Sequence, residues 1–291
     1  NNSWINGTRT YSKSYTYFLA PTKRGVFLIG QSSIEADGVT YKTSPIEIVV
    51  TAAVDKPKDP NDPEFIASES IHLVAEVSKT TPYLNESISV VYKLYVAENT
   101  GVRNWDELDT PRYNDFWSQN IAVKELAVKK GKYKGENYRY VVLKKTVLFP
   151  QKSGELTLEP LTLDVSVEVP SGRRDIFGRR TMTTTTRTVT AGKRIIKVKP
   201  LPKAGKPQNF SGAVGQFQFS ATRSKKSLNA TEAFQLTLAV EGKGNLKLFE
   251  LPNPNLPPTL EVYEPEYLED INTTLSGTAG SISDTYTVVP N

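Results

Sequence analysis

The sequence predicts an all-β protein made of tandem β-sandwich domains, and three observations lead to this prediction. Aromatic residues are frequent, with 14 Tyr, 11 Phe and 3 Trp, and apolar residues alternate with polar ones as they do in half-buried strands. No long stretch carries an apolar stripe at the period of a helix. A Pro-x-Lys-x-Gly pattern occurs at Pro21 and again at Pro150 in matching apolar surroundings. A chain of 291 residues with such a repeat is expected to form two or three similar domains.

Residues 1–54 are expected to hold the C-terminal part of a first domain. Residues 8–20 alternate as a strand, and the Pro21 turn then ends on a glycine and leads into a return strand, so the pattern predicts a hairpin. Asp37-Gly38 marks the next tight turn, and residues 46–50 alternate as a closing strand. These elements amount to about half a sandwich, so the first copy is expected to be incomplete.

Residues 55–64 differ sharply in composition and are expected to form a linker. Pro57, Pro60 and Pro63 stand there among charged residues and Asn61. Proline keeps such a segment extended and removes ladder donors, which suits a semi-rigid spacer. The density of Asp and Asn also suggests a calcium-binding linker, but the spacing matches no calcium loop, so the charged spacer is the preferred interpretation.

The second domain, with inserted loops, is expected at residues 65–202, and the third at residues 208–291. The two domains start alike, because residues 84–96 and residues 228–240 share a Leu-Asn pair followed by an alternating apolar strand.

The third domain is expected to be truncated. Tyr286 and Pro290 match Tyr17 and Pro21 of the first copy, so the sequence stops where further strands of the pattern are due. A half-sandwich exposes an open edge and an apolar face. We therefore expect one outer copy to be completed by further residues or by a neighbouring molecule.

Composition excludes several kinds of chemistry. The chain has no Cys, which rules out thiol nucleophiles, disulfides and thiolate metal sites. Its single histidine, His72, lies in an alternating strand on the face opposite Ile71 and Leu73, so no multi-histidine site is possible. Basic residues, 36 against 31 acidic ones, are scattered, which does not favour nucleic acid. We expect no enzyme, no catalytic or metal-binding residues, and no cofactor.

The segment 105–117 is the first candidate for partner binding, because Trp, Tyr and Arg are common interface anchors. An alternative interpretation places its tryptophans in the sandwich core, with the neighbouring carboxylates in water. The candidate residues are Trp105, Arg112, Tyr113, Phe116 and Trp117.

The basic loop at residues 173–180 is the second candidate, and it lies in an insertion that the first copy lacks. Four arginines around a phenylalanine suit an anion or an acidic partner. The alternative is a mobile hairpin tip followed by an edge strand at residues 181–186. The candidate residues are Arg173, Arg174, Phe177, Arg179 and Arg180.

Several of these runs together resemble the BatD family, the aerotolerance (oxygen-tolerance) proteins of Bacteroides-like bacteria. Residues 112–117 resemble the family's proline-then-Phe-Trp segment, and residues 136–154 resemble its central hairpin. Residues 210–215 and 242–247 resemble the opening and second strands of its next domain. The resemblance covers the chain from about residue 65 onward, and the first 50 residues fit the preceding repeat of the family.

This resemblance implies tandem immunoglobulin-like β-sandwich domains, the outer two incomplete here, on the periplasmic side of the inner membrane. It implies a parent protein with a signal peptide and one C-terminal anchor, both absent from this chain, and membrane attachment only through that anchor. No run here has the roughly 20 apolar residues that span a bilayer.

The resemblance also implies protein partners, namely membrane proteins with von Willebrand A-type domains, tetratricopeptide-repeat proteins and an AAA-type ATPase. It carries over no catalytic residues. Our first hypothesis is a non-enzymatic, membrane-tethered scaffold of an aerotolerance (oxygen-stress) complex that binds other envelope proteins. The alternative is a carbohydrate- or surface-binding adhesin built on the same modules.

Overall fold

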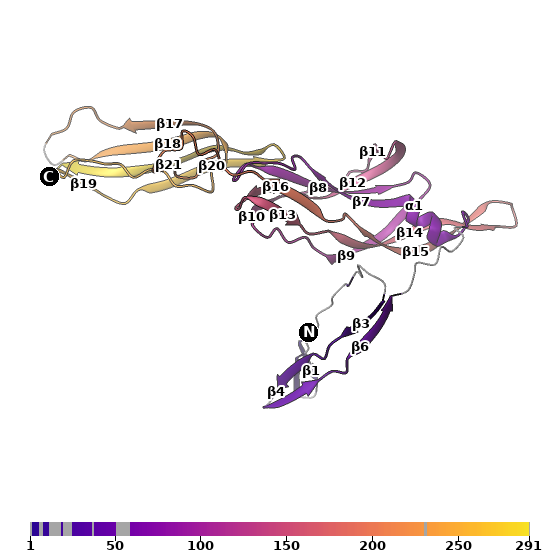
Figure 1. Ribbon diagram of the computed structural model, residues 1–291. Coiled ribbons are helices and arrows are strands. Elements are labelled where there is room, and N and C mark those ends of the chain that lie inside the picture. Colours follow the sequence, from indigo (N-terminus) through magenta and orange to yellow (C-terminus); the bar gives the residue numbers. More distant parts are fainter. Residues whose placement is uncertain are drawn as a thin grey trace. The chain divides into compact units, whose positions relative to one another are not determined.

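A computed structural model describes residues 2–5, 8–11, 19, 25–36, 38–50, 59–229 and 232–290. These residues form strands and one short helix, in two compact units, Asn1–Lys58 and Asp59–Asn291 (Figure 1). All strand pairs between them are antiparallel, apart from one isolated bridge. The prediction of an all-β protein is confirmed.

The described residues of the first unit form three two-stranded pairs. They are β1 (Asn2–Ile5) with β2 (Thr8–Tyr11), β3 (Gly25–Ile29) with β6 (Ile46–Val50), and β4 (Ser33–Ala36) with β5 (Val39–Lys42). The expected closing strand therefore exists and pairs with β3. The rest of the strand expected at residues 8–20, the Pro21 turn before Gly25, Asp37 and residues 51–58 of the linker lie outside the described residues.

The helix α1 (Pro63–Ser70) begins inside the segment that the sequence suggested as an extended linker. The Asp62 carboxylate caps it by accepting a 3.0 Å hydrogen bond from the Glu64 backbone N–H, and Pro63 occupies the first turn, where its missing N–H costs nothing. Ala67 is fully buried in the core of the second domain. The cap and the packing of α1 against β14 and β15 stabilise a helix here, although the proline-rich sequence favours an extended segment.

One layer of the second domain is a five-stranded sheet in the order β10-β12-β8-β7, with β11 pairing to the free part of β12. Its strands are β7 (Ile71–Val77), β8 (Ile88–Val96), β10 (Phe116–Ile121), β11 (Lys129–Tyr133) and β12 (Glu136–Pro150).

The opposite layer holds the sheet β15-β14-β9 and the pair β13-β16. Its strands are β9 (Gly101–Asp109), β13 (Gly154–Leu158), β14 (Thr162–Arg174), β15 (Arg180–Thr190) and β16 (Arg194–Val198). Every second residue of β14 from Leu163 to Val169 is fully buried, and these side chains pack with Val90, Tyr92 and Leu94 of β8. Two antiparallel layers with alternating inward residues make a β-sandwich of the kind found in immunoglobulin-like domains.

The Pro-x-Lys-x-Gly segment at Pro150 is not a hairpin, contrary to the prediction from sequence. β12 ends at Pro150 and pairs with β8, β10 and β11, whereas β13 begins at Gly154 and pairs with β16 in the opposite layer. The segment therefore turns the chain from one layer to the other. Gly154 has φ +112°, a conformation that favours glycine, which explains why the motif ends on this residue.

The repeat itself is preserved in the strand pairing of the first two copies. β3 begins at Gly25 and pairs with β6, as β13 begins at Gly154 and pairs with β16. Between them lies β4–β5 in the first copy and β14–β15 in the second. The strands of the first hairpin have 4 residues each, but those of the second have 13 and 11. The second copy is thus distinguished by a long hairpin, which we call the β14–β15 arm.

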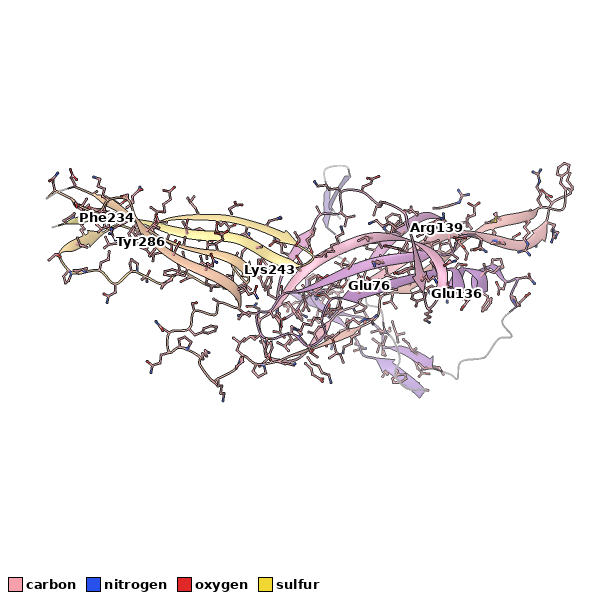
Figure 2. All side chains as sticks on the ribbon, turned by 90° about the horizontal axis from the view of Figure 1, so that it is seen from above. Glu76, Glu136, Arg139, Phe234, Lys243 and Tyr286 are labelled. Atoms are coloured by element: carbon pink, nitrogen blue, oxygen red, sulfur yellow. The ribbon has the colours of Figure 1, made fainter. Side chains whose placement is uncertain are left out.

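The last part of the chain forms a single five-stranded sheet, in the order β17-β18-β21-β19 with β20 pairing to β21. Its strands are β17 (Gly215–Arg223), β18 (Phe234–Gly244), β19 (Leu260–Val262), β20 (Glu266–Thr274) and β21 (Gly277–Pro290). Figure 2 shows Phe234 and Tyr286 near one end of this sheet and Lys243 near the other. The segment after β18 packs Leu246 and Leu251 against Val240 and Ile282, so a connecting segment covers part of the sheet's apolar face.

Candidate functional site

The aromatic segment 105–117 is split between the two layers of the second domain. Trp105 lies on β9, whereas Phe116 and Trp117 lie on β10 of the opposite sheet. Both tryptophans are half-buried. The structure therefore does not gather these rings on one surface.

Three of the five residues selected in this segment pack against the main core, namely Trp105, Tyr113 and Phe116. The Tyr113 hydroxyl donates to Thr146 Oγ1 at 3.4 Å, and Tyr113 lies beside Tyr92, whose pKa is raised chiefly by burial. Trp117 instead makes an edge-to-face contact with Phe149 at 5.6 Å between ring centroids. Of the five, only Arg112 is exposed. Most of this segment thus contributes to packing.

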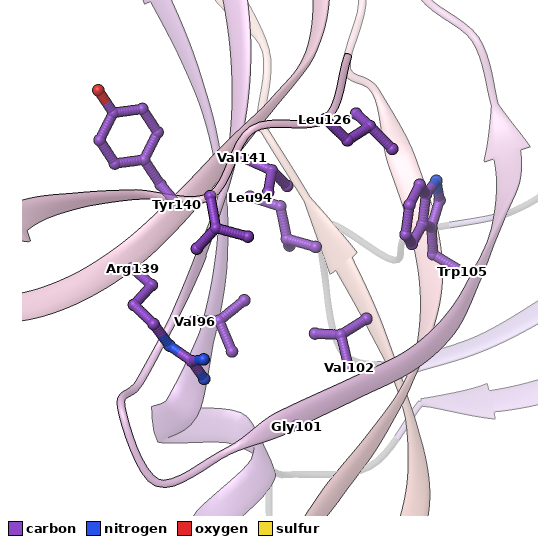
Figure 3. A pocket seen from close by; sticks show the side chains of 10 residues that line it. Leu94, Val96, Gly101, Val102, Trp105, Leu126, Arg139, Tyr140 and Val141 are labelled. Carbon is purple, nitrogen blue, oxygen red and sulfur yellow. The ribbon is translucent and has the colours of Figure 1, made fainter.

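Trp105 also lines an apolar cavity between the two layers, which we call the β9 groove. Its volume is about 480 Å³, and Figure 3 shows β9 on one side and β8 and β12 on the other. Its walls include Leu94, Val96, Val102, Trp105, Leu126 and Val141. Leu126 and Val128 come from the segment between β10 and β11, and both are well exposed.

One charged side chain, Arg139 of β12, lines the β9 groove. Its Nη2 donates to the Thr100 carbonyl at 2.7 Å and to the Ala97 carbonyl at 3.4 Å. Its Nε is buried and has no hydrogen-bond partner within the described residues. The groove therefore combines apolar walls with one unused donor.

Strand β9 forms the end of the sheet β15-β14-β9 in the part of the chain that the structure describes. Its pairing with β14 shifts register on both sides of the stretch 104–107. Charged side chains line this edge, and two are paired: Glu107 with Lys144 at 2.6 Å, and Arg103 with Glu168 at 3.0 Å. An open strand edge thus lies directly beside the apolar groove.

The β14–β15 arm ends in a turn closed by hydrogen bonds. Asp175 Oδ1 accepts from the backbone N–H groups of Phe177 at 2.9 Å and Arg179 at 2.8 Å. The Gly178 N–H donates to the Asp175 carbonyl, and Gly178 has φ +76°. The Arg174 guanidinium donates to the Gly178 carbonyl at 2.7 Å.

This turn brings together all five residues that the sequence selected in the loop, and it adds Ile176. Ile176 is 94% exposed and Phe177 is 78% exposed, the highest values among the large apolar side chains described. The four arginines are exposed just behind them, Arg173, Arg174 and Arg180 on the strands and Arg179 in the turn. Sequence reasoning omitted Ile176, although an apolar pair within a run of arginines was the signal that could have found it.

A second aromatic group, missed from the sequence, lies on the outer face of the β7-β8-β12 sheet. We call it the tyrosine cluster, and it consists of His72, Tyr95, Tyr133, Tyr138 and Tyr140. The His72 ring stacks on Tyr133 at 4.3 Å, and its Nε2 lies 3.1 Å from the Glu69 carbonyl. The alternation Tyr138-x-Tyr140, paired across to Tyr95, was the available signal.

Strand β11 covers this cluster closely. A Cβ on Gly131 would lie only 2.8 Å from the Tyr140 ring, so glycine is needed there for β11 to pack over it. Burial lowers the pKa of His72, and burial with the nearby Glu76 carboxylate raises the pKa of Tyr95 to about 12. We interpret the cluster as a small satellite core.

Within the described ranges, no group of three or more His, Asp or Glu side chains is placed to hold a metal ion. No helix among those residues has the length and apolar character to cross a bilayer.

Comparison with known proteins yields one family match. Residues 1–50 match the family model described as BatD DUF11 like domain. No curated protein matches the sequence. Among solved structures, the chain is similar to surface layer protein SbsC, domains 4–9, at 9% identity and a TM-score of 0.13, over 93% of this chain and 31% of that one. The chain thus spans about a third of that structure, and a TM-score this low supports no structural argument.

Proposed function

Because this chain belongs to the BatD family, whose domain model matches residues 1–50, we propose that it is a non-enzymatic scaffold that binds other envelope proteins. In this proposal the parent protein is tethered on the periplasmic side of the inner membrane and serves an aerotolerance complex. Its partners are membrane proteins with von Willebrand A-type domains and tetratricopeptide-repeat proteins.

The observation that carries the proposal is the open edge of β9 beside the β9 groove. An exposed edge can receive an extended segment of another protein as an added strand, with main-chain hydrogen bonds supplying affinity. Alternate side chains of that segment would point toward the groove, where Val102 and Trp105 offer apolar contacts.

The geometry of β9 also limits which segment can pair. The register shifts leave 104–107 as the regular stretch, so the added strand would be short. Asp106 and Glu107 give this stretch an acidic character, although Lys144 already pairs with Glu107. A partner segment with a basic residue opposite Asp106 and apolar residues beside it fits this edge best.

The non-enzymatic part of the proposal rests on the chemistry of the side chains. The chain has no Cys, and its one histidine is stacked within the tyrosine cluster. The β9 groove is lined by apolar residues and one arginine, without the paired carboxylates of a glycoside hydrolase.

The adhesin alternative has less support from the geometry. Sugar binding favours a shelf of exposed aromatic rings, as would arise if Trp105, Tyr113 and Trp117 shared a surface. Here the tryptophans lie on opposite layers, and Tyr113 packs on the core. We therefore retain the scaffold as the proposed function.

A pull-down of the anchored parent protein from envelope extracts tests the proposal, with captured proteins identified by mass spectrometry. Val102→Asp places a carboxylate in the groove, and Asp106→Lys reverses the charge at one exposed position of the edge without altering the core. We expect both variants to lose a partner with a von Willebrand A-type or tetratricopeptide-repeat domain. Leu268→Asp, at an exposed site of the last sheet, is the matched control and should retain it.

Thermal unfolding of each variant separates loss of binding from loss of folding. A variant lacking residues 171–180 serves as a second arm, because it removes the other candidate surface and leaves β9 intact. Undiminished recovery of the same partner by Val102→Asp and Asp106→Lys, both folded, would contradict binding at β9.

A further inference from the structure

We propose that the β14–β15 arm is a membrane-contact element that inserts Ile176 and Phe177 into the interface of an anionic bilayer, with its arginines at the level of the lipid phosphates. This goes beyond the proposed scaffold function and does not depend on it. It also differs from the expectation that the parent protein meets the membrane only through its anchor.

The tip presents its apolar residues in a defined conformation. The Asp175 carboxylate holds the backbone N–H groups of Phe177 and Arg179, and the Arg174 guanidinium holds the Gly178 carbonyl. The turn is therefore organised by its own side chains. Ile176 and Phe177 are left at the apex with 94% and 78% of their surface in water.

Exposure of this kind is unfavourable unless something covers it. Single exposed apolar residues are common, but two large adjacent ones at the end of a protrusion mark an interaction site more often than a random surface does. No other large apolar side chain among the described residues is as exposed as either of them.

The positive charges of the four arginines behind the tip indicate that it contacts an anionic surface. Arg174 and Arg180 lie opposite each other on the two strands, and Arg173 and Arg179 flank them, so the cations surround the base of the apolar tip. Within the described residues, none of the four forms an ion pair with a carboxylate. Arg174 uses one N–H on the Gly178 carbonyl, and the other guanidinium donors of this group can bind phosphate oxygens, which guanidinium groups bind in a bidentate manner.

The arm extends from the body of its domain, as Figure 1 shows beyond α1. Near its base, β14 shifts register between Pro170 and Arg174, and Ser171 and Thr181 hydrogen-bond across the strands. At the corresponding place the first copy has only the short β4–β5 hairpin. The outer part of the arm, residues 171–180, is thus an addition to the repeated fold, and its residues lie outside the core cluster to which the inner part of β14 belongs.

The shape of the arm favours a bilayer over an acidic protein. A specific protein interface buries about 800 Å² on each partner, which a two-residue convex apex cannot supply. A bilayer interface accepts apolar side chains from a narrow protrusion and attracts arginine through its surface potential. The apolar residues at the tip would reach the acyl chains, and the arginines behind them would lie at the level of the lipid phosphates.

Vesicle flotation of the full chain tests the proposal. We expect binding to vesicles of phosphatidylethanolamine with phosphatidylglycerol, little binding to phosphatidylcholine alone, and release as salt is raised. The double variant Ile176→Ser with Phe177→Ser should bind at least about tenfold more weakly, because two apolar side chains no longer insert. Each of Arg173→Gln and Arg180→Gln should weaken binding about fivefold.

Matched controls use the same changes elsewhere on the chain. Phe219→Ser alters a phenylalanine that is 56% exposed on β17, and Arg187→Gln alters an exposed arginine further along β15. Both should bind as the unaltered chain does. Equal losses in these controls would show a general charge or hydrophobicity effect and would overturn the proposal.

The absence of cysteine allows a direct measurement of insertion. A polarity-sensitive dye on Phe177→Cys should shift to the blue and brighten when anionic vesicles are added, and the same dye on Phe219→Cys should not. An unchanged signal at position 177 while the chain floats with vesicles would place the contact elsewhere. Failure of the chain to float, with a crosslinker at position 177 capturing an acidic protein, would assign the arm to a protein partner instead.

Discussion

The inward-facing residues of β14 show how single side chains hold the second domain together. Leu163, Val165, Val167 and Val169 are fully buried, and each packs between the sheets. The residues between them face outward, where Asp164 accepts a hydrogen bond from Thr188 and Glu168 pairs with Arg103. Alternation along one strand thus separates core from surface.

Leu163→Ala should destabilise the second domain by about 2–5 kcal/mol, because it removes a fully buried side chain and leaves a cavity. Urea unfolding followed by fluorescence would measure the loss. The control, Leu268→Ala, changes a side chain that is 58% exposed and should stay within about 0.5 kcal/mol of the unaltered chain. Equal effects from both changes would contradict the burial assigned to Leu163.

The lowered pKa of His72 predicts a pH dependence of stability. Burial pushes this pKa below its ordinary value of 6.5, while the unfolded chain keeps the ordinary value. Between the two values the unfolded chain binds more protons, so the free energy of unfolding falls as pH drops through about 6.5 toward the folded pKa. Above that window the contribution of His72 is fully present.

His72→Gln should therefore show a weaker loss of stability on acidification than the unaltered chain. Urea midpoints measured for both proteins across this window would test it. The carboxylates titrate in both proteins, so their effect cancels when the two midpoints at each pH are subtracted. A difference that stayed constant with pH would mean that His72 titrates alike in the folded and unfolded states.

At the scale of elements, the turn at residues 151–153 is the point where the chain changes layer. The alternating segments on either side predict a hairpin, because a short turn ending on glycine usually joins neighbouring strands. The pairing of β13 with β16 shows that the turn serves the sandwich as a corner. Local turn signals do not say which strands become neighbours.

Gly154→Ala should destabilise the domain by about 1–3 kcal/mol, because φ is +112° at this position and an added side chain strains the backbone. A Cβ there would meet no atom within 4 Å, so the effect isolates backbone strain from steric clash. Gly101→Ala is the control, since its Cβ would make only ordinary contacts with Glu168. Thermal unfolding should rank Gly154→Ala clearly below Gly101→Ala.

The β14–β15 arm belongs to the same scale. Its strands correspond to β4 and β5 of the first copy but are longer, and the added length projects from the core. Where two copies of one module differ, the difference is the natural place for a function that the repeat does not need.

At the scale of the whole molecule, the described residues divide into two units at Lys58 and Asp59. The largest core cluster is built entirely from residues between Ile66 and Val198. No described side chain of the first unit belongs to that cluster, so we expect its stability not to require residues 1–58.

A fragment of residues 59–291 should fold alone and unfold at the same temperature as the second domain in the full chain. Circular dichroism and thermal unfolding would test this prediction. As a control, the double change Leu163→Ala with Val165→Ala in the fragment should lower its unfolding temperature, because both side chains belong to the core. A fragment that is unfolded, or that melts markedly earlier than the full chain, would contradict independent folding.

The sequence by itself determined the all-β class, the repeat, the family resemblance and the inward face of most strands. These features follow from local patterns, since a period of two residues records which face of a strand is buried. The alternation around His72 correctly placed that residue on the face opposite Ile71 and Leu73. The basic loop was likewise recognisable from adjacent residues alone.

Only the tertiary structure decided which strands are neighbours. That information separated Trp105 from Trp117, turned the expected hairpin at Pro150 into a corner, and brought His72 into the tyrosine cluster. It also placed the open edge of β9 beside an apolar groove and left Ile176 and Phe177 at the end of an arm. The reason is physical: the alternating pattern of a strand records which of its faces is buried, whereas the choice of partner strand depends on packing between segments far apart in the chain.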